Sequence, residues 1–269
     1  MNMPPPPLLR IAVLQTNIVW CAPEINRQHI ERLLHDSPHA DLYLLPEMFD
    51  TGFCMNPQAI AQGAPETLVW MQHIAAAKGC ALAGSIAIRE RDSYYNRFYF
   101  VEPQKVTYYD KHHLFGYGGE KKHYQQGQSR IIAPFRGVRF LLQVCYDLRF
   151  PVFARNKGDY DAILYVANWP EPRITVWDTL LRARAIENQC YVAGANRVGK
   201  DPSCSYPGNS LIINPYGQAE AEAAIGQECI ISAEIDMPRL EAFRKKFPVG
   251  DDRDAFSLGL SHEEEQPSL

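Results

Sequence analysis

The sequence predicts an α/β fold in which mixed sheets pack against helices. Short apolar runs, typical of buried strands, alternate with longer stretches whose apolar residues recur at helical spacing. Two strand-like runs also follow each other without a helix between them, at residues 94–111. The sheets should therefore contain antiparallel as well as parallel pairs. The length of 269 residues suits one large α/β domain.

The first half of the chain contains the clearest helical patterns. Residues 9–17 predict a strand, and residues 22–37 predict a helix. Four apolar residues of that helix are expected to share one face: Ile25, Ile30, Leu33 and Leu34. The segments that follow are a strand at 40–47, a helix at 65–80, a strand at 81–90, and a strand pair within 94–111 that turns at Glu102 and Pro103.

The second half places strand-like runs around one long helix. The predicted strands lie at residues 139–147, 161–169, 191–198, 210–218 and 228–236, and the helix lies at 175–189. No internal repeat or interior linker interrupts this order. We therefore expect one domain over residues 1–250 and an acidic C-terminal tail over residues 251–269, with its last residues mobile or bound to a partner.

Composition limits the classes of function. The chain is 46% apolar and 22% charged, as in ordinary globular proteins, and its net charge of −4 argues against a nucleic-acid partner. No apolar run is long enough to predict a membrane span, and the proline-rich start is not typical of a signal peptide. Seven cysteines without a C-x-x-C spacing predict free thiols in a reducing cytoplasm.

Three polar residues stand where strand-like runs end: Glu47, Lys111 and Cys145. Ligands of α/β proteins bind at the carboxyl ends of strands, so side chains far apart in sequence can meet there. A thiol, a carboxylate and an ammonium are sufficient for acyl transfer. The thiolate attacks, the carboxylate takes its proton, and the ammonium stabilises the thiolate and the oxyanion of the tetrahedral intermediate. The lysine is also expected to lower the pKa of Cys145.

Each residue also has an ordinary structural interpretation. A lone cysteine at the end of an apolar run is more often a small core residue than a nucleophile. The Pro-Glu and Tyr-Asp-Lys segments around Glu47 and Lys111 are most often solvated turns. Spacing alone does not decide between these interpretations and the catalytic one.

Several motifs resemble those of the nitrilase, or carbon–nitrogen hydrolase, superfamily. The stretches LLPEMFDTGF around Glu47, YDKHHLFGYGGEKKHYQQG around Lys111, and VCYDLRFP around Cys145 match that family in order and in local context. Further similarity runs through LYVANWPEPR, LLRARAIENQCYVAGANRVG and GNSLIINPYGQ, so that the resemblance covers nearly the whole chain.

The resemblance implies a four-layer αββα sandwich with mixed sheets, assembled as a homodimer or a higher homo-oligomer. It implies that Cys145 is the nucleophile, Glu47 the general base and acid, and Lys111 the oxyanion stabiliser. A second glutamate of the family matches Glu120, which would orient Lys111 and the substrate nitrogen. The backbone N–H of Tyr146 would be the other oxyanion donor.

The nucleophile context CYDLRFP resembles the bacterial omega-amidase branch. Omega-amidases release ammonia from the side amide of 2-oxoglutaramate or 2-oxosuccinamate. Such a small-molecule amide has an anionic far end, which calls for a cation in the pocket. The candidate cations are Arg149, Arg173, Lys121 and His113, although Arg149 could equally form a buried pair with Asp147 or another carboxylate that shapes the loop. Candidate apolar pocket walls are Phe49, Tyr117, Tyr146 and Trp169, each of which could instead belong to the core.

Other functions remain open at the level of sequence. His112, His113 and His123 lie close together, but adjacent histidines point apart, one packed and one exposed, so we expect no metal and no other cofactor. A non-catalytic thiol sensor would need Cys145 but no positioned base. An N-carbamoyl amino acid hydrolase and a nitrilase would share the mechanism, and the Cys-Tyr-Asp context argues against the nitrilase.

Overall fold

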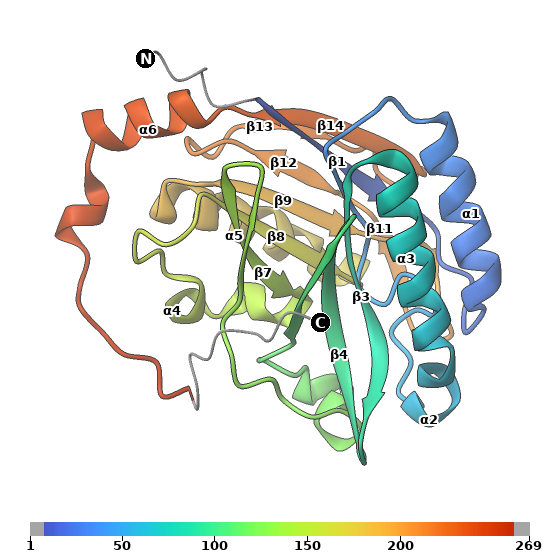
Figure 1. Ribbon diagram of the computed structural model, residues 1–269. Coiled ribbons are helices and arrows are strands. Elements are labelled where there is room, and N and C mark those ends of the chain that lie inside the picture. The colour runs from blue at the N-terminus through green and yellow to red at the C-terminus, as the bar shows by residue number, and fades with distance from the viewer. Residues whose placement is uncertain (1–7, 261–269) are drawn as a thin grey trace.

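The computed structural model describes residues 8–260, and these form two six-stranded sheets that face each other. Helices cover the outer face of each sheet, which gives the layer order helix, sheet, sheet, helix (Figure 1). This arrangement confirms the predicted αββα sandwich. No helix within the described residues is long and apolar enough to cross a membrane.

The first sheet has the strand order β14-β1-β2-β3-β4-β5. Its parallel centre, β1 with β2 and β2 with β3, is flanked by antiparallel pairs, so the sheet is mixed as predicted. Its strands are β1 (Leu9–Gln15), β2 (Leu42–Leu44), β3 (Ala81–Glu90), β4 (Ser93–Glu102), β5 (Lys105–Asp110) and β14 (Cys229–Ile235).

The second sheet has the strand order β13-β12-β9-β8-β7-β6, and its parallel centre is β7, β8 and β9. Its strands are β6 (Ile132–Phe135), β7 (Val138–Val144), β8 (Ala162–Ala167), β9 (Tyr191–Asn196), β12 (Leu211–Ile213) and β13 (Ala219–Glu222). A small antiparallel hairpin of β10 (Val198–Lys200) and β11 (Ser205–Pro207) leaves this sheet beside β9.

Two long helices pack on the first sheet and one on the second. The helices α1 (Pro23–Asp36) and α3 (Ala64–Lys78) lie side by side over the first sheet, and α5 (Ile174–Asn188) covers the second (Figure 1). The shorter helices are α2 (Pro57–Ile60), α4 (Pro151–Ala154) and α6 (Met237–Lys246). The 3₁₀ turns lie at Ala61–Gly63, Gly116–Gly118, Glu120–Lys122, Cys145–Arg149, Glu171–Arg173 and Val249–Asp252.

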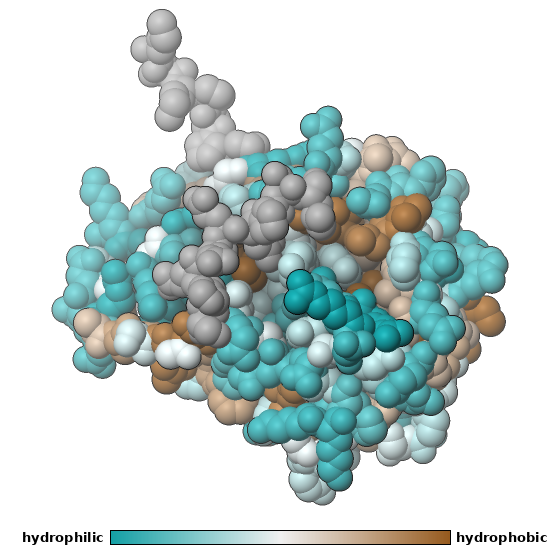
Figure 2. Space-filling view, turned by 60° about the horizontal axis from the view of Figure 1, so that its bottom comes forward, coloured by the Kyte–Doolittle hydropathy of each residue, from teal (hydrophilic) through white to brown (hydrophobic). Residues whose placement is uncertain are grey.

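Alternating side chains on each strand build three apolar layers. In β1, Ile11 and Val13 point into the core between the two sheets, whereas Ala12 and Leu14 pack toward α1 and α3. This is the period-two pattern of a strand that is buried on both faces. The outer surface is different: most side chains on the face drawn in Figure 2 are hydrophilic, and the hydrophobic ones form small patches.

The buried face of α1 differs from the prediction. Ile25 is exposed, and the buried positions are Asn26, Ile30 and Leu34. Asn26 is drawn inward because its amide pairs with both backbone groups of Val19 and donates to the carbonyl of Asp50 at 2.7 Å. A polar residue therefore takes an interior position where loop carbonyls need a donor.

The chain beyond α6 contains little regular structure. The 3₁₀ turn Val249–Asp252 is followed by residues 253–260, which have neither helix nor strand. Leu258 and Leu260 pack against the core between the sheets. The division into a domain over 1–250 and a tail stays a prediction, and the last nine residues of that tail lie outside the described residues.

The contact between α5 and β9 has no room for an added methyl group. A Cβ on Gly194 would lie 2.7 Å from Leu181 and 2.8 Å from Trp177. We expect Gly194→Ala to lower the free energy of unfolding by about 1–3 kcal/mol through overpacking, measured by urea denaturation. Gly259→Ala is the control, since its Cβ meets no atom within 4 Å. Equal stability of the two variants would contradict the tight packing.

Candidate active site

The structure brings Glu47, Lys111 and Glu120 into one buried cluster. Glu47 follows β2, and Lys111 follows β5. Lys111 Nζ lies 3.0 Å from Glu47 Oε1 and 2.9 Å from Glu120 Oε2, and the side chains of all three residues are 0% exposed. A cation thus stands between two carboxylates at one end of the first sheet.

Glu47 is held by further donors on both of its carboxylate oxygens. Asn96 Nδ2 in β4 donates to Oε1 at 2.8 Å, and the backbone N–H of Asn168 donates to Oε2 at 2.9 Å. The Asn168 amide also donates to the Glu47 carbonyl at 2.7 Å. Because Asn168 follows β8 of the second sheet, these bonds fix the carboxylate between the two sheets.

Glu120 holds Lys111 and the loop between them. Its Oε2 accepts the backbone N–H of Phe115 at 2.6 Å, in addition to its contacts with the ammonium. Burial alone would lower the pKa of Lys111, but the attraction of Glu120 and Glu47 outweighs burial and raises that pKa well above its ordinary value. Lys111 is therefore a permanent cation. Burial raises the pKa of Glu120, and Lys111 counteracts part of this rise.

Cys145 stands at the turn from β7 into the 3₁₀ segment Cys145–Arg149. Its φ is +46°, in the left-handed region that residues with a Cβ seldom adopt. The cysteine is partly exposed, whereas the core residues of β7 before it are buried. A strained residue at the end of a strand, turned toward a cavity, is typical of functional sites.

Asp147 ties this turn to the loop that carries Lys111. Its buried carboxylate accepts four hydrogen bonds: from the Val144 N–H at 2.9 Å, the Tyr109 hydroxyl at 2.8 Å, and the backbone and Nδ1 of His113 at 2.9 and 2.8 Å. The alternative pairing of Asp147 with Arg149 is therefore wrong, since other donors already occupy the carboxylate. Through Asp147 the ends of β5 and β7 are held together.

The pKa of Cys145 is raised well above its ordinary value, contrary to the expectation that Lys111 would lower it. Burial is the largest cause, and repulsion between a thiolate and the Glu47 carboxylate is the second. The attraction of Lys111 lowers the pKa, but it is smaller than either of these two effects. The resting thiol is thus protonated, beside a carboxylate that can accept its proton.

A cavity of about 300 Å³ opens over Cys145. It is lined by most of the predicted pocket residues together with residues of the β10–β11 hairpin and the loop after β2: Glu47, Phe53, Met55, Phe115, Tyr117, Gly118, Cys145, Tyr146, Arg149, Asn168, Trp169, Pro170, Arg173, Asp201, Ser203, Cys204 and Tyr206. Tyr117 is 93% exposed and stands at the rim, whereas Trp169 is buried in the wall.

Two guanidinium groups face this cavity. Arg149 lies over the ring of Trp169 at 5.3 Å from its centroid, and Arg173 lies over the ring of Phe115 at 5.4 Å. Within residues 8–260, neither guanidinium forms an ion pair with a carboxylate. Aromatic contacts orient these cations and leave their N–H groups available to an anion.

Three of the predicted candidates lie elsewhere. Phe49 belongs to the core between the first sheet and α3, where it packs against Trp70, and it does not line the cavity. Lys121 is exposed outside the cavity. His113 is engaged by Asp147 and stacks on Phe150.

The histidine segment also differs from the prediction of one packed and one exposed ring. His112 and His113 are both half-buried, because His112 stacks on Phe153 and His113 stacks on Phe150. Between residues 8 and 260, no group of three or more histidine, cysteine, aspartate or glutamate side chains is placed to hold a metal ion.

Sequence reasoning missed Asn96 and Asn168, which both bind Glu47. A signal for Asn96 exists, since an amide inside the apolar strand YYNRFYF is costly to bury without a partner. A signal for Asn168 also exists, since it stands at the end of a strand, as Glu47, Lys111 and Cys145 do. The hairpin residues Asp201 and Tyr206, joined by a hydrogen bond of 2.5 Å, carry no comparable signal because their place beside Cys145 depends on the tertiary fold.

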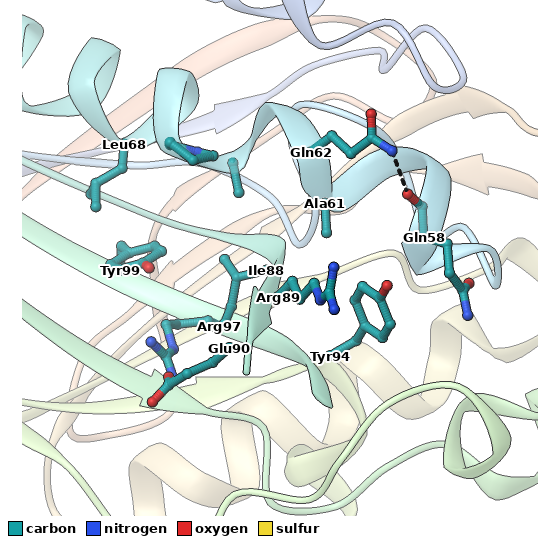
Figure 3. A pocket seen from close by; sticks show the side chains of 12 residues that line it. Gln58, Ala61, Gln62, Leu68, Ile88, Arg89, Glu90, Tyr94, Arg97 and Tyr99 are labelled. Atoms are coloured by element: carbon teal, nitrogen blue, oxygen red, sulfur yellow. Dashed lines mark hydrogen bonds and ion pairs between the residues drawn. The ribbon is translucent and has the colours of Figure 1, made fainter. Parts of the chain in front are cut away.

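A larger groove, of about 820 Å³, lies outside this site between α3 and the β3–β4 hairpin (Figure 3). Its Arg97 is paired with Glu90 at 2.6 Å and with Asp110 at 2.7 Å. None of the residues that line this groove is a cysteine, so the groove offers no thiol nucleophile.

Comparison with known proteins agrees with this geometry. The family model described as carbon-nitrogen hydrolase matches residues 10–245. The omega-amidase YafV of Escherichia coli strain K12 is 46% identical over 254 residues, which cover 94% of this chain and 99% of that protein. The 2-oxoglutaramate amidase of Bacillus subtilis strain 168 is 36% identical over 250 residues, which cover 90% of this chain and 96% of that enzyme.

A solved structure is also similar to this chain over nearly its whole length. The protein XC1258 from Xanthomonas campestris, described as a CN-hydrolase superfamily protein with an arsenic adduct in the active site, superposes with a TM-score of 0.88 at 39% identity, covering 94% of this chain and all of that one. The family model, the relatives and the solved structure each match nearly the whole length of this chain. The chain therefore belongs to the carbon-nitrogen hydrolase family, in the omega-amidase branch of the nitrilase superfamily.

Proposed function

We propose that the protein is a cysteine-dependent omega-amidase that hydrolyses the side amide of 2-oxoglutaramate or 2-oxosuccinamate to the acid and ammonia. The observation that carries this proposal is the buried cluster of Glu47, Lys111 and Glu120, because its Glu47 lines the same cavity as Cys145 and two arginines. The relatives named omega-amidase and 2-oxoglutaramate amidase support the choice of substrate.

The first chemical step is acylation of the thiol. Glu47 takes the proton of Cys145 as the sulfur attacks the amide carbon, so that the thiolate forms only as it reacts. The carbonyl oxygen becomes an oxyanion that binds Lys111 and the backbone N–H of Tyr146. Tyr146 lies in the first turn of the segment Cys145–Arg149, where backbone N–H groups have no partner within the helix.

The second stage releases ammonia and then the acid. The tetrahedral intermediate collapses as Glu47 returns its proton to the leaving nitrogen, and a thioester remains on Cys145. Water replaces the ammonia, Glu47 takes a proton from that water, and the hydroxyl attacks the thioester carbon. Sulfur leaves with the proton that Glu47 returns, and the starting thiol is restored. Glu120 acts through Lys111, whose ammonium it holds against the site.

The size and charge of the cavity fit this substrate class. A volume of about 300 Å³ is at the lower end for ligand sites and suits a short keto-acid amide. Arg149 and Arg173 supply cationic donors for the carboxylate at the far end of the substrate, and Trp169, Phe115 and Tyr146 supply apolar walls. Two bonds between a guanidinium and a carboxylate would also fix the orientation of the amide over the sulfur.

We also propose that the enzyme works in the cytoplasm as a homodimer or a higher homo-oligomer. Seven free cysteines support a reducing compartment, and the resemblance to the superfamily supports pairing of the sandwiches. Light scattering of the purified protein measures the assembly, and a monomer with full activity would contradict it.

A substrate panel distinguishes the proposed function from its rivals. We expect ammonia release from 2-oxoglutaramate and little or none from glutamine, a simple nitrile or an N-carbamoyl amino acid, with the Cys145→Ser variant as the inactive control. Carbon dioxide together with ammonia from the carbamoyl compound would indicate the carbamoylase. Preferred consumption of the nitrile would indicate a nitrilase. No turnover of any compound, with Cys145 still reactive, would favour the thiol sensor.

The arginine variants test recognition of the far carboxylate. Arg149→Met and Arg173→Met should each lower kcat/KM for 2-oxoglutaramate by about 10- to 100-fold, since a hydrogen bond to a charged group contributes about 1.5–3 kcal/mol. Activity on an uncharged amide of similar length should change much less. Arg89→Met, in the exposed outer groove, is the matched control. Equal losses on the charged and uncharged amides would contradict the assignment.

The raised pKa of Cys145 predicts how its alkylation depends on pH. Iodoacetamide reacts with the thiolate, so its rate should rise about tenfold per pH unit from about pH 7 to pH 9 without a plateau. The sign follows from burial and from the Glu47 charge, which both disfavour the thiolate. A plateau below pH 8 would instead show that Lys111 dominates. Peptide mass spectrometry at Cys145 separates this reaction from that of the other cysteines.

A further inference from the structure

Two cysteines that the mechanism does not use lie on adjoining loops. Cys21 is exposed in the loop before α1, and Cys54 is buried in the loop after β2. The backbone N–H of Cys21 donates to the Thr51 carbonyl at 2.9 Å, and Asn26 binds both loops through Val19 and Asp50. The two loops are therefore held against each other by the fold.

The two thiols are also close to each other. Trp20, the sequence neighbour of Cys21, packs against the apolar cluster that contains Cys54, and the Cys54 thiol is near enough to raise the pKa of Cys21. The backbone N–H of Asn56 donates to Cys54 Sγ at 3.4 Å, which orients that sulfur. Burial first, and the Cys54 thiol second, raise the pKa of Cys21 to about 11. Cys21 is thus a thiol at neutral pH, and its oxidation should be slow there and faster in alkaline solution.

We propose that Cys21 and Cys54 are a modification site that forms a reversible disulfide on exposure to a peroxide. The exposed Cys21 thiol loses its proton, and the thiolate attacks one peroxide oxygen. The O–O bond breaks and the leaving hydroxide takes up a proton, so that a sulfenic acid and one water form. The Cys54 sulfur then attacks the Cys21 sulfur, the S–O bond breaks, and the second water leaves. Two thiols lose two hydrogens and two electrons in total, and one hydrogen peroxide is reduced to two waters. An added dithiol reverses the reaction.

The position of Cys54 connects this site to the catalytic cavity. Its sequence neighbours Phe53 and Met55 both line the cavity, and the Phe53 ring lies 5.1 Å from Lys111 Nζ. The Cys54 carbonyl accepts the Tyr124 hydroxyl at 2.8 Å, just beyond the loop that carries Glu120. A disulfide holds its sulfurs about 2.05 Å apart, closer than any contact between free thiols, so its formation pulls the two loops together. Because residues 53–55 form part of the cavity wall, we expect this pull to shift the wall.

The cross-link itself is tested in the Cys145→Ser variant, which removes the catalytic thiol. The protein is treated with hydrogen peroxide at about pH 8.5, where more thiolate is present, and digested without reductant for mass spectrometry. We expect a peptide pair joined through Cys21 and Cys54 and lighter by two hydrogens. It should disappear on adding dithiothreitol and on the further change Cys54→Ser. Cys229→Ser, at a half-buried cysteine of β14, is the matched control that should keep it.

The link to the cavity is tested with the active enzyme. Peroxide also oxidises Cys145, but that lowers the number of active sites and therefore kcat, with KM unchanged. A displaced wall should raise KM, so we expect oxidised wild type to show a KM increase of severalfold that dithiothreitol reverses and that Cys21→Ser lacks. Oxidation of Cys21 without a cross-link would overturn the disulfide. A cross-link with unchanged KM would overturn its effect on the cavity.

Discussion

The burial of one lysine between two glutamates is the constraint on which the rest of the site depends. Lys111, Glu47 and Glu120 have no solvent exposure, so each charge relies on protein partners for the stabilisation that water would otherwise provide. Removing Lys111 would leave two buried carboxylates without a cation beside them. This explains why donors converge on the cluster from several elements, including the Asn96 amide and the backbone N–H groups of Phe115 and Asn168.

The two sheets contribute different parts of the chemistry. The first sheet and its loops carry the charged cluster, and the second carries Cys145 and Asn168. Asp147 joins the two parts, because it accepts donors from the turn after β7 and from the loop after β5. The site is therefore complete only when the apolar core between the sheets is packed. The packing of the core and the geometry of the site thus depend on the same interface between the two sheets.

Much of this arrangement was readable in the sequence, because strand and helix periodicity is local and Glu47, Lys111 and Cys145 each follow a strand. Features that depend on the tertiary surroundings of a residue could not be read from the sequence. The inward position of Asn26 and the core position of Phe49 follow from what packs on each face. The direction of the Cys145 pKa shift follows from a balance between burial, Glu47 and Lys111 that spacing cannot give. The Asn168 contact with Glu47 spans both sheets.

The most direct test of the account is the Glu47→Gln variant, which keeps the shape of the side chain and removes its ability to accept a proton. Two rates are compared with those of wild type: ammonia release from 2-oxoglutaramate and alkylation of Cys145. We expect ammonia release to fall by about 100- to 10,000-fold, the usual contribution of a general base, while Cys145 still alkylates and the protein stays folded. Ammonia release near the wild-type rate would contradict the assignment of Glu47 as the base.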